Sequence, residues 1–445
     1  MSRFYSSLCE NILFPLSDLI TGRSIYKKLK FLEKVQYWPI EKLQDYQNKQ
    51  LRKVTSFAYN KVPYYRKVFD ERNLKADDIQ TTDDLVKLPL LTKEIIRSKG
   101  INQFIYGKKE KLIKGTTSGS SGIQGEFYLS KDAQSLTYAA ELLFFKWGGF
   151  RLGEKHLQTG ITPSRGFEKS IKDFLFQCYY VSAFNLSDKD LERIYQLIIK
   201  KKIKTLIGYA SSLYCIAKYA KEKGESLKLN LIISLGDILY SHYRKIIEEI
   251  FNCKVTDTYG CGEGFMIAGQ CEHQNYHNCM PLLFIEIIDS KGNRVPDGKL
   301  GRVVLTRLDL NPMPLIRYEL GDLAILSKNE KCKCGKEFRL VDSIQGRDTD
   351  IITTPHRYKL IVHFFTGIFE HEQAIRQFQV LQEKKDEILI KIIPTENFNK
   401  KVLTKIERRI LKECNNDLKV KFKIVDNIPL TKSGKRRFVI SKFKY

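Results

Sequence analysis

Short apolar segments alternate with helical patterns over the middle of this chain, and this alternation limits the possible folds more than any other feature. From Lys111 to Gly260, strand-like runs such as KIKTLIGYA, LNLIISLGD and KVTDTYG are separated by stretches such as SSLYCIAKYAKEKG and HYRKIIEEIFNC, whose apolar residues recur at helical spacing. Strands that alternate with helices in this way are typical of an α/β sheet covered by helices. The sequence therefore predicts an α/β fold for the centre of the chain.

The segments on either side have different patterns. Residues 1 to about 100 have apolar residues at three- and four-residue spacing, with a break at Pro63, which predicts helices. Residues 280–326 contain closely spaced strand patterns and the turns SKGN and PDGK. From Gly346 onward, strand candidates surround one charged helix, as in a small α+β domain of about 100 residues. We therefore expect a large N-terminal α/β domain with helices on mixed sheets, residues 1–345, and a small C-terminal α+β domain, residues 346–445.

Composition excludes several classes of protein. Hydrophobic residues make up 42% and charged residues 29% of the chain, the balance of a globular protein. No run approaches the roughly 20 apolar residues of a spanning helix, and the N-terminus carries Glu10 and Asp18 and lacks the pattern of a secretory signal. The ten cysteines mostly stand singly in apolar runs, as reduced thiols do. We therefore expect a cytoplasmic protein.

The formal net charge of +25 bears on binding partners. Nucleic acid is the first candidate for so basic a chain, but the lysines are spread along the whole sequence and no nucleic-acid motif is present. We therefore expect no nucleic-acid partner. Three explanations of the basic surface remain: a bias in composition without a partner, an anionic membrane, and phosphorylated substrates.

A glycine- and serine-rich segment, GTTSGSSG, runs from Gly115 to Gly122 after the apolar run LIK. Glycines let the backbone approach a phosphate closely, and successive N–H groups with hydroxyls can bind phosphate oxygens. No Gly-Lys-[Ser/Thr] follows, so this is not the usual P-loop. Taken alone, a flexible linker explains the segment equally well.

Four further motifs follow this loop: DTYGCGE (257–263), RYELGD (317–322), GRDTD (346–350) and PLTKSGK (429–435). Each alone could be a turn, a charged loop or a basic tail. In this order, and over nearly the whole chain, they resemble the adenylate-forming superfamily of acyl-CoA synthetases, luciferases and nonribosomal-peptide adenylation domains. Together with KVTSFAYNKVPYYRKVFDE, FKWGGFRLGE and LVKLPLLTKEIIRSKG, they make the chain similar to the phenylacetate–CoA ligase-like branch, and within it to members from capsule and lipopolysaccharide biosynthesis clusters.

The resemblance implies a set of residues that bind ATP. The loop would wrap the triphosphate, Tyr259 would lie against the adenine, and Gly260 would lie near the substrate carboxylate. Asp322 would accept hydrogen bonds from the ribose hydroxyls. The implied ATP- and AMP-binding residues are Thr117, Ser118, Gly119, Ser120, Ser121, Gly122, Asp237, Tyr259, Gly260 and Asp322.

The resemblance also implies three catalytic residues. Glu263 would share Mg²⁺ with the phosphate oxygens, and Arg347 would lie near the ribose and the phosphate. Lys435 would stabilise negative charge as the carboxylate attacks the α-phosphorus. The C-terminal domain that carries Lys435 swings about a hinge near residues 347–350 in this superfamily, which makes it a mobile lid.

Three positions depart from the family pattern. The loop is followed by IQGE, where many relatives have Pro and Lys, so one usual cation near the phosphates is missing. Asp237 stands where the family usually has Glu, so its contact with adenine is expected to differ. Thr349 stands at the hinge position, where relatives commonly have Asp or Lys.

Cysteine and histidine gather in two segments, Cys271 with His277 and Cys332 with Cys334. Thiolates and an imidazole in a set of four suit tetrahedral Zn²⁺. The C-x-C spacing is a weak signal, His273 and Cys279 are further candidates, and reduced loop residues are the alternative. Some members of the branch carry a similar set with zinc, so the resemblance implies a structural zinc ion at Cys271, His277, Cys332 and Cys334.

The expected reaction converts a carboxylic acid and MgATP to acyl-AMP and pyrophosphate, and then transfers the acyl group to coenzyme A. An amine acceptor, giving an amide in surface-polysaccharide biosynthesis, is the second hypothesis. A basic nucleic-acid or membrane-surface binding protein on a degenerate ligase fold is the third. The presence of Glu263, Asp322, Arg347 and Lys435 favours an enzyme.

Two segments leave alternatives open. The walls of an acid pocket are expected at Tyr138, Trp147, Gly208, Tyr209 and Gly236, although aromatic stretches more often belong to a core. The apolar N-terminal segment 14–20 precedes the basic residues Arg23, Lys27, Lys28 and Lys30. This segment either packs on the protein's own core or rests on the inner face of a membrane.

Overall fold

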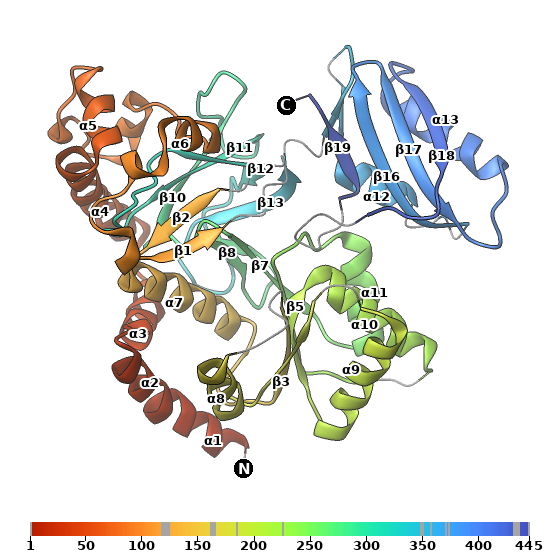
Figure 1. Ribbon diagram of the computed structural model, residues 1–445, viewed down its shortest axis with the longest axis horizontal. Coiled ribbons are helices and arrows are strands. Elements are labelled where there is room, and N and C mark those ends of the chain that lie inside the picture. Colours follow the sequence, from red (N-terminus) through yellow and green to blue (C-terminus); the bar gives the residue numbers. More distant parts are fainter. Residues whose placement is uncertain are drawn as a thin grey trace.

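The computed structural model describes residues 2–116, 125–160, 166–183, 186–224, 227–347, 351–356, 358–369, 372, 374–429 and 437–443. One large mixed sheet with flanking helices occupies most of the molecule, and a smaller sheet with its own helices lies at one end (Figure 1). The predicted α/β class is confirmed.

Helices dominate the first hundred residues, as the spacing predicted. Val62 has extended backbone angles, as the residue before a proline prefers, and Pro63 starts the next helix. The elements are α1 (Ser2–Leu8), η1 (Cys9–Leu13), α2 (Phe14–Thr21), α3 (Ile25–Val35), α4 (Ile40–Lys61), α5 (Pro63–Asp70), η2 (Ala76–Asp78), η3 (Thr82–Lys87), α6 (Lys93–Lys99), η4 (Ile101–Phe104) and η5 (Lys109–Lys111).

The parallel half of the large sheet has the order β7-β6-β5-β3-β4. Its strands are β3 (His156–Gly160), β4 (Cys178–Ser182), β5 (Thr205–Tyr209), β6 (Leu231–Leu235) and β7 (Val255–Cys261). The helices of this region are α7 (Lys131–Trp147), α8 (Phe167–Leu175), α9 (Asp188–Lys201), α10 (Ala210–Glu222) and α11 (Ser241–Phe251). The carboxyl ends of these parallel strands meet at one edge, where open α/β sheets bind their ligands.

The antiparallel half continues from β7 in the order β8-β9-β13-β12-β11-β10. Its strands are β8 (Phe265–Gln270), β9 (Tyr276–Asn278), β10 (Leu283–Ile288), β11 (Leu300–Arg307), β12 (Tyr318–Leu326) and β13 (Leu340–Arg347). The strands β1 (Ile113–Thr116) and β2 (Glu126–Leu129) form a separate antiparallel pair, and residues 117–124 between them, which include most of the glycine- and serine-rich segment, lie outside the described residues.

The C-terminal part forms a small sheet with the order β18-β17-β16-β19 (Figure 1). Its elements are β14 (Ile351–Thr353), β15 (Lys359–Ile361), α12 (Val362–Phe369), β16 (Ile375–Lys384), β17 (Glu387–Pro394), α13 (Lys401–Glu413), β18 (Lys419–Ile424) and β19 (Val439–Ser441). The ring of Tyr240, just before α11, meets Phe438 edge to face at 5.1 Å between ring centroids. The small sheet therefore packs against the helices of the parallel half.

Among the described residues, none of the helices combines the length and the apolar character that crossing a membrane requires.

Candidate functional site

Glu263 lies buried in the turn between β7 and β8, at the carboxyl edge of the parallel strands. Its Oε1 atom lies 2.9 Å from Lys93 Nζ and accepts a hydrogen bond from the hydroxyl of Tyr318 at 3.0 Å. Burial raises the pKa of Glu263, but the charge and hydrogen bond of Lys93 outweigh burial and hold that pKa below its usual value. Glu263 is therefore an ionised carboxylate at neutral pH, as a Mg²⁺ ligand must be.

Lys93 reaches Glu263 because β12 holds the start of α6. The N–H of Leu91 donates to the carbonyl of Arg317 at 2.9 Å, and the carbonyl of Leu91 accepts from Glu319 at 2.8 Å. Thr92 caps α6 through its side chain, so Lys93 begins the helix beside Tyr318. Sequence reasoning did not single out Lys93 or Tyr318, although both stand in the quoted segments LPLLTKEI and RYELGD.

Tyr259 and Asp322, both assigned to the nucleotide by the sequence, lie together. The hydroxyl of Tyr259 on β7 donates to Oδ2 of Asp322 on β12 at 2.7 Å. Asp322 is paired in register with Arg347, the last residue of β13. The side chain of Arg347 lies outside the described residues. The sheet thus brings three separate motifs to one place.

The backbone beside Glu263 is closely packed against both neighbouring strands. A Cβ on Gly264, which has φ +86°, would lie 2.5 Å from a methyl group of Leu129, so only glycine fits there. A Cβ on Gly115 would lie 3.4 Å from the carbonyl oxygen of Gly262, so the β1 residue that begins the glycine- and serine-rich segment lies next to this turn. The residues of the segment itself, Thr117, Ser118, Gly119, Ser120, Ser121 and Gly122, lie outside the described residues, as does Lys435.

Tyr209 and Gly236 form part of the same edge. A Cβ on Gly236 would lie 2.5 Å from the ring of Tyr209, and its φ of +78° also requires glycine. Likewise a Cβ on Gly208 would lie 2.1 Å from Oγ1 of Thr159. These contacts place the three predicted pocket residues Gly208, Tyr209 and Gly236 side by side at the ends of β5 and β6.

The side chain of Asp237 binds the N-terminus of α10. Its two carboxylate oxygens accept hydrogen bonds from the backbone N–H groups of Ala210 at 2.5 Å and Ser211 at 3.2 Å. A carboxylate at this position interacts favourably with the helix dipole and satisfies two N–H groups. The structure thus assigns Asp237 the task of joining β6 to α10; its predicted contact with adenine stays a prediction.

Trp147, a predicted wall of an acid pocket, is buried beside His277. Its ring packs 5.7 Å from the ring of His277 and 6.2 Å from that of Phe338, and its Nε1 donates to Gln36 at 2.6 Å. Trp147 is the last residue of α7 and packs against the cysteine and histidine segments. The structure thus shows Trp147 packed in the core beside the Cys/His segments; its predicted part in an acid pocket stays a prediction. Tyr138, on the same helix, is 40% exposed beneath Arg23, whose guanidinium lies 5.7 Å from the ring centroid.

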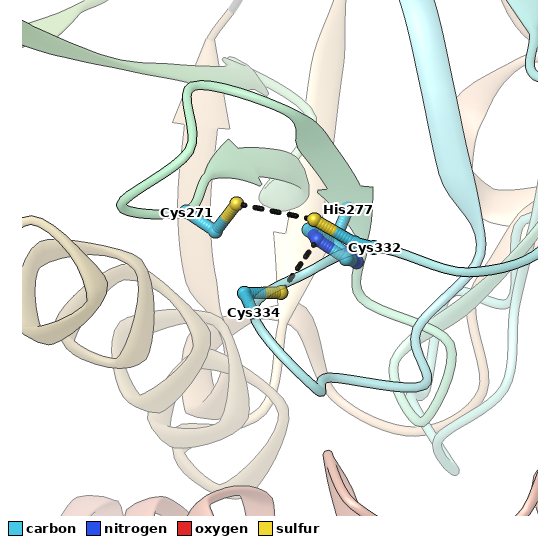
Figure 2. Close-up of side chains that lie close together, drawn as sticks. All are labelled: Cys271, His277, Cys332 and Cys334. Atoms are coloured by element: carbon cyan, nitrogen blue, oxygen red, sulfur yellow. Dashed lines mark hydrogen bonds between the residues drawn. The ribbon is translucent and has the colours of Figure 1, made fainter.

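Cys271, His277, Cys332 and Cys334 converge into one cluster, as Figure 2 shows. Their potential ligand atoms all lie within 4.8 Å of one another. The sulfurs of Cys271 and Cys332 are 3.8 Å apart, and Cys334 Sγ is 3.3 Å from His277 Nε2. Two sulfurs bound to one tetrahedral zinc ion at about 2.3 Å each would be about 3.8 Å apart. The Cys271–Cys332 and Cys334–His277 separations therefore suit a tetrahedral zinc ion, and the spare candidates His273 and Cys279 are not in the set.

His277 is oriented for this role. It is fully buried, and its Nδ1 lies 2.7 Å from the carbonyl oxygen of Phe338. Metal-binding histidines usually donate one ring N–H to such an acceptor, which leaves the other nitrogen free for the ion. Here that other nitrogen, Nε2, faces Cys334.

Comparison with known proteins agrees with this description. Residues 352–442 match the family model described as the CapK C-terminal domain. The chain is 24% identical to Protein CapK of Staphylococcus aureus over 98% of this chain and 97% of that protein. It is 23% identical to phenylacetate-coenzyme A ligase of Thermus thermophilus over 88% of this chain and 92% of that protein.

Solved structures share the fold. A 2-hydroxyisobutyryl-CoA ligase in its postadenylation state superimposes with a TM-score of 0.74 at 18% identity, covering 91% of both chains. In its thioesterification state the same protein gives a TM-score of 0.62 at 20% identity, over 91% of both chains. The chain therefore has the fold of the adenylate-forming CoA ligases. The resemblance to the phenylacetate–CoA ligase-like branch is confirmed, and the chain is also similar to Protein CapK.

Proposed function

We propose that this protein is an AMP-forming acid–CoA ligase. In the first step a carboxylate oxygen attacks the α-phosphorus of ATP, and the bond to the β-phosphate oxygen breaks, which gives acyl-AMP and pyrophosphate. In the second step the thiolate of coenzyme A attacks the acyl carbonyl and AMP leaves. The observation that carries the proposal is the ionised Glu263, held by Lys93 and Tyr318 at the same sheet edge as the Tyr259–Asp322 pair.

Each group has a task that its surroundings support. Glu263 is the carboxylate available to hold Mg²⁺ against the triphosphate, and Lys93 keeps it ionised. Asp322 has two acceptor oxygens for the vicinal hydroxyls of ribose, and its hydrogen bond from Tyr259 fixes its orientation. Tyr209 and Gly236 close the edge where the acid would enter. We retain Arg347 and Lys435 as the cations that stabilise the charge on the phosphates.

The C-terminal part, from about residue 346, acts in this proposal as a mobile lid. The support is its own small sheet and its match to a separate family model. The two states of the 2-hydroxyisobutyryl-CoA ligase have TM-scores of 0.74 and 0.62 against this chain, so the present arrangement is more like the postadenylation state. The lid would then carry Lys435 in one orientation and serve acyl transfer in another.

We also propose a structural zinc ion at the Cys/His cluster. Four protein ligands leave no open position for a substrate, so the ion would stabilise the fold instead of taking part in the reaction. For the setting we propose the cytoplasm, with peripheral contact at the inner face of the membrane. A role in capsule polysaccharide biosynthesis rests on the resemblance alone.

The test is pyrophosphate release with a panel of carboxylic acids and MgATP, repeated with coenzyme A and with amines as acceptors. An acid that releases pyrophosphate and gives a thioester supports the proposal, whereas an amide product moves the assignment to an acid–amine ligase. Glu263→Gln should abolish the release. Asp297→Asn, which alters a partly exposed carboxylate paired with Arg339, is the matched control and should leave it unchanged. No release with any acid by the folded, ATP-binding protein would contradict the proposal.

A further inference from the structure

The N-terminal helical segment, residues 2–21, packs on the protein through one face only. The hydroxyl of Tyr5 donates to the carbonyl of Leu175 in α8 at 2.7 Å, and the ring of Phe14 meets Phe176 at 6.3 Å. Ser6 and Asp18 are buried on this same inner face, although they are polar. The sequence left open whether this segment packs on the protein's own core or rests on a membrane. The structure shows that one face of the segment packs on the core.

The opposite face is apolar and exposed. The exposed side chains are Phe4 at 80%, Ile12 at 57%, Leu16 at 49%, Leu19 at 79% and Ile20 at 76%. Helix α8 adds Ile171 at 45% and Phe174 at 82%. We call these seven residues the N-terminal apolar face. An amphipathic helix normally turns its polar residues to solvent, and large exposed apolar patches mark sites of contact.

The charges around this face are arranged for an anionic partner. Glu10 is directed to Arg151, which donates to it at 2.9 Å, and buried Asp18 accepts the N–H of Tyr26 at 2.6 Å. Both acidic groups of the segment are therefore neutralised or turned inward. By contrast Lys27, at the start of α3, and Lys169, on α8, are exposed. Apolar side chains flanked by lysines are typical of segments that lie in the headgroup region of a membrane.

The position of the face also suits a docked enzyme. Figure 1 shows α1, α2 and α8 together at one end of the molecule and the C-terminal sheet at the other. Contact at the N-terminal apolar face would leave the C-terminal part and the sheet edge with Glu263 open to substrates.

We propose that the N-terminal apolar face docks the protein on the surface of an anionic lipid bilayer. The apolar side chains enter the region between headgroups and acyl chains, and the lysines contact the lipid phosphates. The contact is peripheral and reversible, and it weakens as salt screens the lysines.

The experiment is flotation of the full chain with vesicles of phosphatidylcholine, with and without phosphatidylglycerol. We expect flotation with the anionic vesicles, release at high salt, and at least about a tenfold loss of binding for the triple variant Leu19→Ser, Ile20→Ser, Phe174→Ser. The matched control replaces three residues of comparable type that are exposed elsewhere, Val86→Ser, Leu310→Ser, Ile424→Ser, and should float like the parent. Thermal unfolding of both variants establishes that they are folded.

Three results would overturn the proposal. The first is equal flotation of the parent and the folded triple variant, and the second is no flotation of the parent at all. The third is concentration-dependent dimerisation of the parent, lost in the triple variant, without binding to vesicles. That third result would assign the face to a second copy of the chain. All these readouts are independent of ligase activity.

Discussion

The ion pair between Lys93 and Glu263 allows a quantitative test of the site. The Glu263 side chain is 1% exposed and that of Lys93 is 12% exposed, so Lys93→Met leaves a buried carboxylate without its counter-charge. Removing one partner of a buried pair typically costs 3–5 kcal/mol. At about 2.1 cal/mol/K per residue over 445 residues, the unfolding entropy is about 0.9 kcal/mol/K, so we expect the Tm to fall by roughly 3–5 °C.

The effect should depend on pH with a definite sign. In the parent the pKa of Glu263 is lowered, so its pairing stabilises the fold above the unfolded carboxyl's pKa of about 4.3, and this stability is lost as the pH falls through the folded pKa. In Lys93→Met burial acts without the lysine and raises the folded pKa of Glu263 above the unfolded one. The variant therefore loses stability as the pH rises. The difference in Tm between parent and variant should therefore widen as the pH rises above the unfolded carboxyl's pKa of about 4.3.

The assay is thermal unfolding at several pH values, with a double-mutant cycle. Lys93→Met combined with Glu263→Gln should be more stable at pH 7 than Lys93→Met alone, because the uncompensated charge is gone. The control is Lys87→Met, which breaks a more exposed pair with Asp84 and should cost at most about 1 kcal/mol. A difference in Tm that stays constant with pH, or a double variant no more stable than the single one, would refute the argument.

Three further predictions concern the nucleotide, the lid and the metal. Asp322→Ala should weaken ATP binding by about 1.5–3 kcal/mol because charge-assisted hydrogen bonds to ribose are lost, and equal affinity by calorimetry would rule this out. Lys435→Ala should abolish acyl-AMP formation but largely spare ATP binding, and an unchanged rate of adenylation removes Lys435 from the mechanism. Purified protein should contain about one zinc per chain, and Cys332→Ser with Cys334→Ser should lower the Tm more than the rate per folded molecule. A zinc content near zero after purification without chelator contradicts the metal site.

The sequence predicted the elements that have a clear period or a specific motif. The alternation between Lys111 and Gly260 predicted the α/β sheet with its covering helices, because buried strands and covering helices differ in length and spacing. The ordered motifs predicted that Tyr259 and Asp322 belong to one site, and the structure joins them by a hydrogen bond. Cys271 and His277 were likewise paired with Cys332 and Cys334, and the four side chains do meet.

Contacts between residues that are far apart in the sequence could not be predicted where no local pattern or motif indicates them. Lys93 begins a short helix like any surface lysine, and only the pairing of Leu91 with β12 brings it to Glu263. The contacts of Trp147 with His277 and Phe338 could not be predicted, because helical spacing shows that a residue is buried but does not show against which neighbour. The N-terminal segment has apolar residues on both faces, so its periodicity could not distinguish the face that packs from the face that stays exposed.

The Cys/His cluster and the nucleotide motifs lie at opposite ends of the same two strands. Strand β8 begins just after Glu263 and ends at Gln270, next to Cys271, while β13 begins at Leu340, paired with His277, and ends at Arg347, paired with Asp322. An ion bound by all four side chains would hold the far ends of both strands together. Because strands are stiff along their length, this clamp would limit how far Glu263 can move relative to Asp322 and to the start of the lid. The proposed ion would lie far from the reacting atoms and would stabilise the platform on which the proposed lid turns, so its loss should affect unfolding before it affects the reaction.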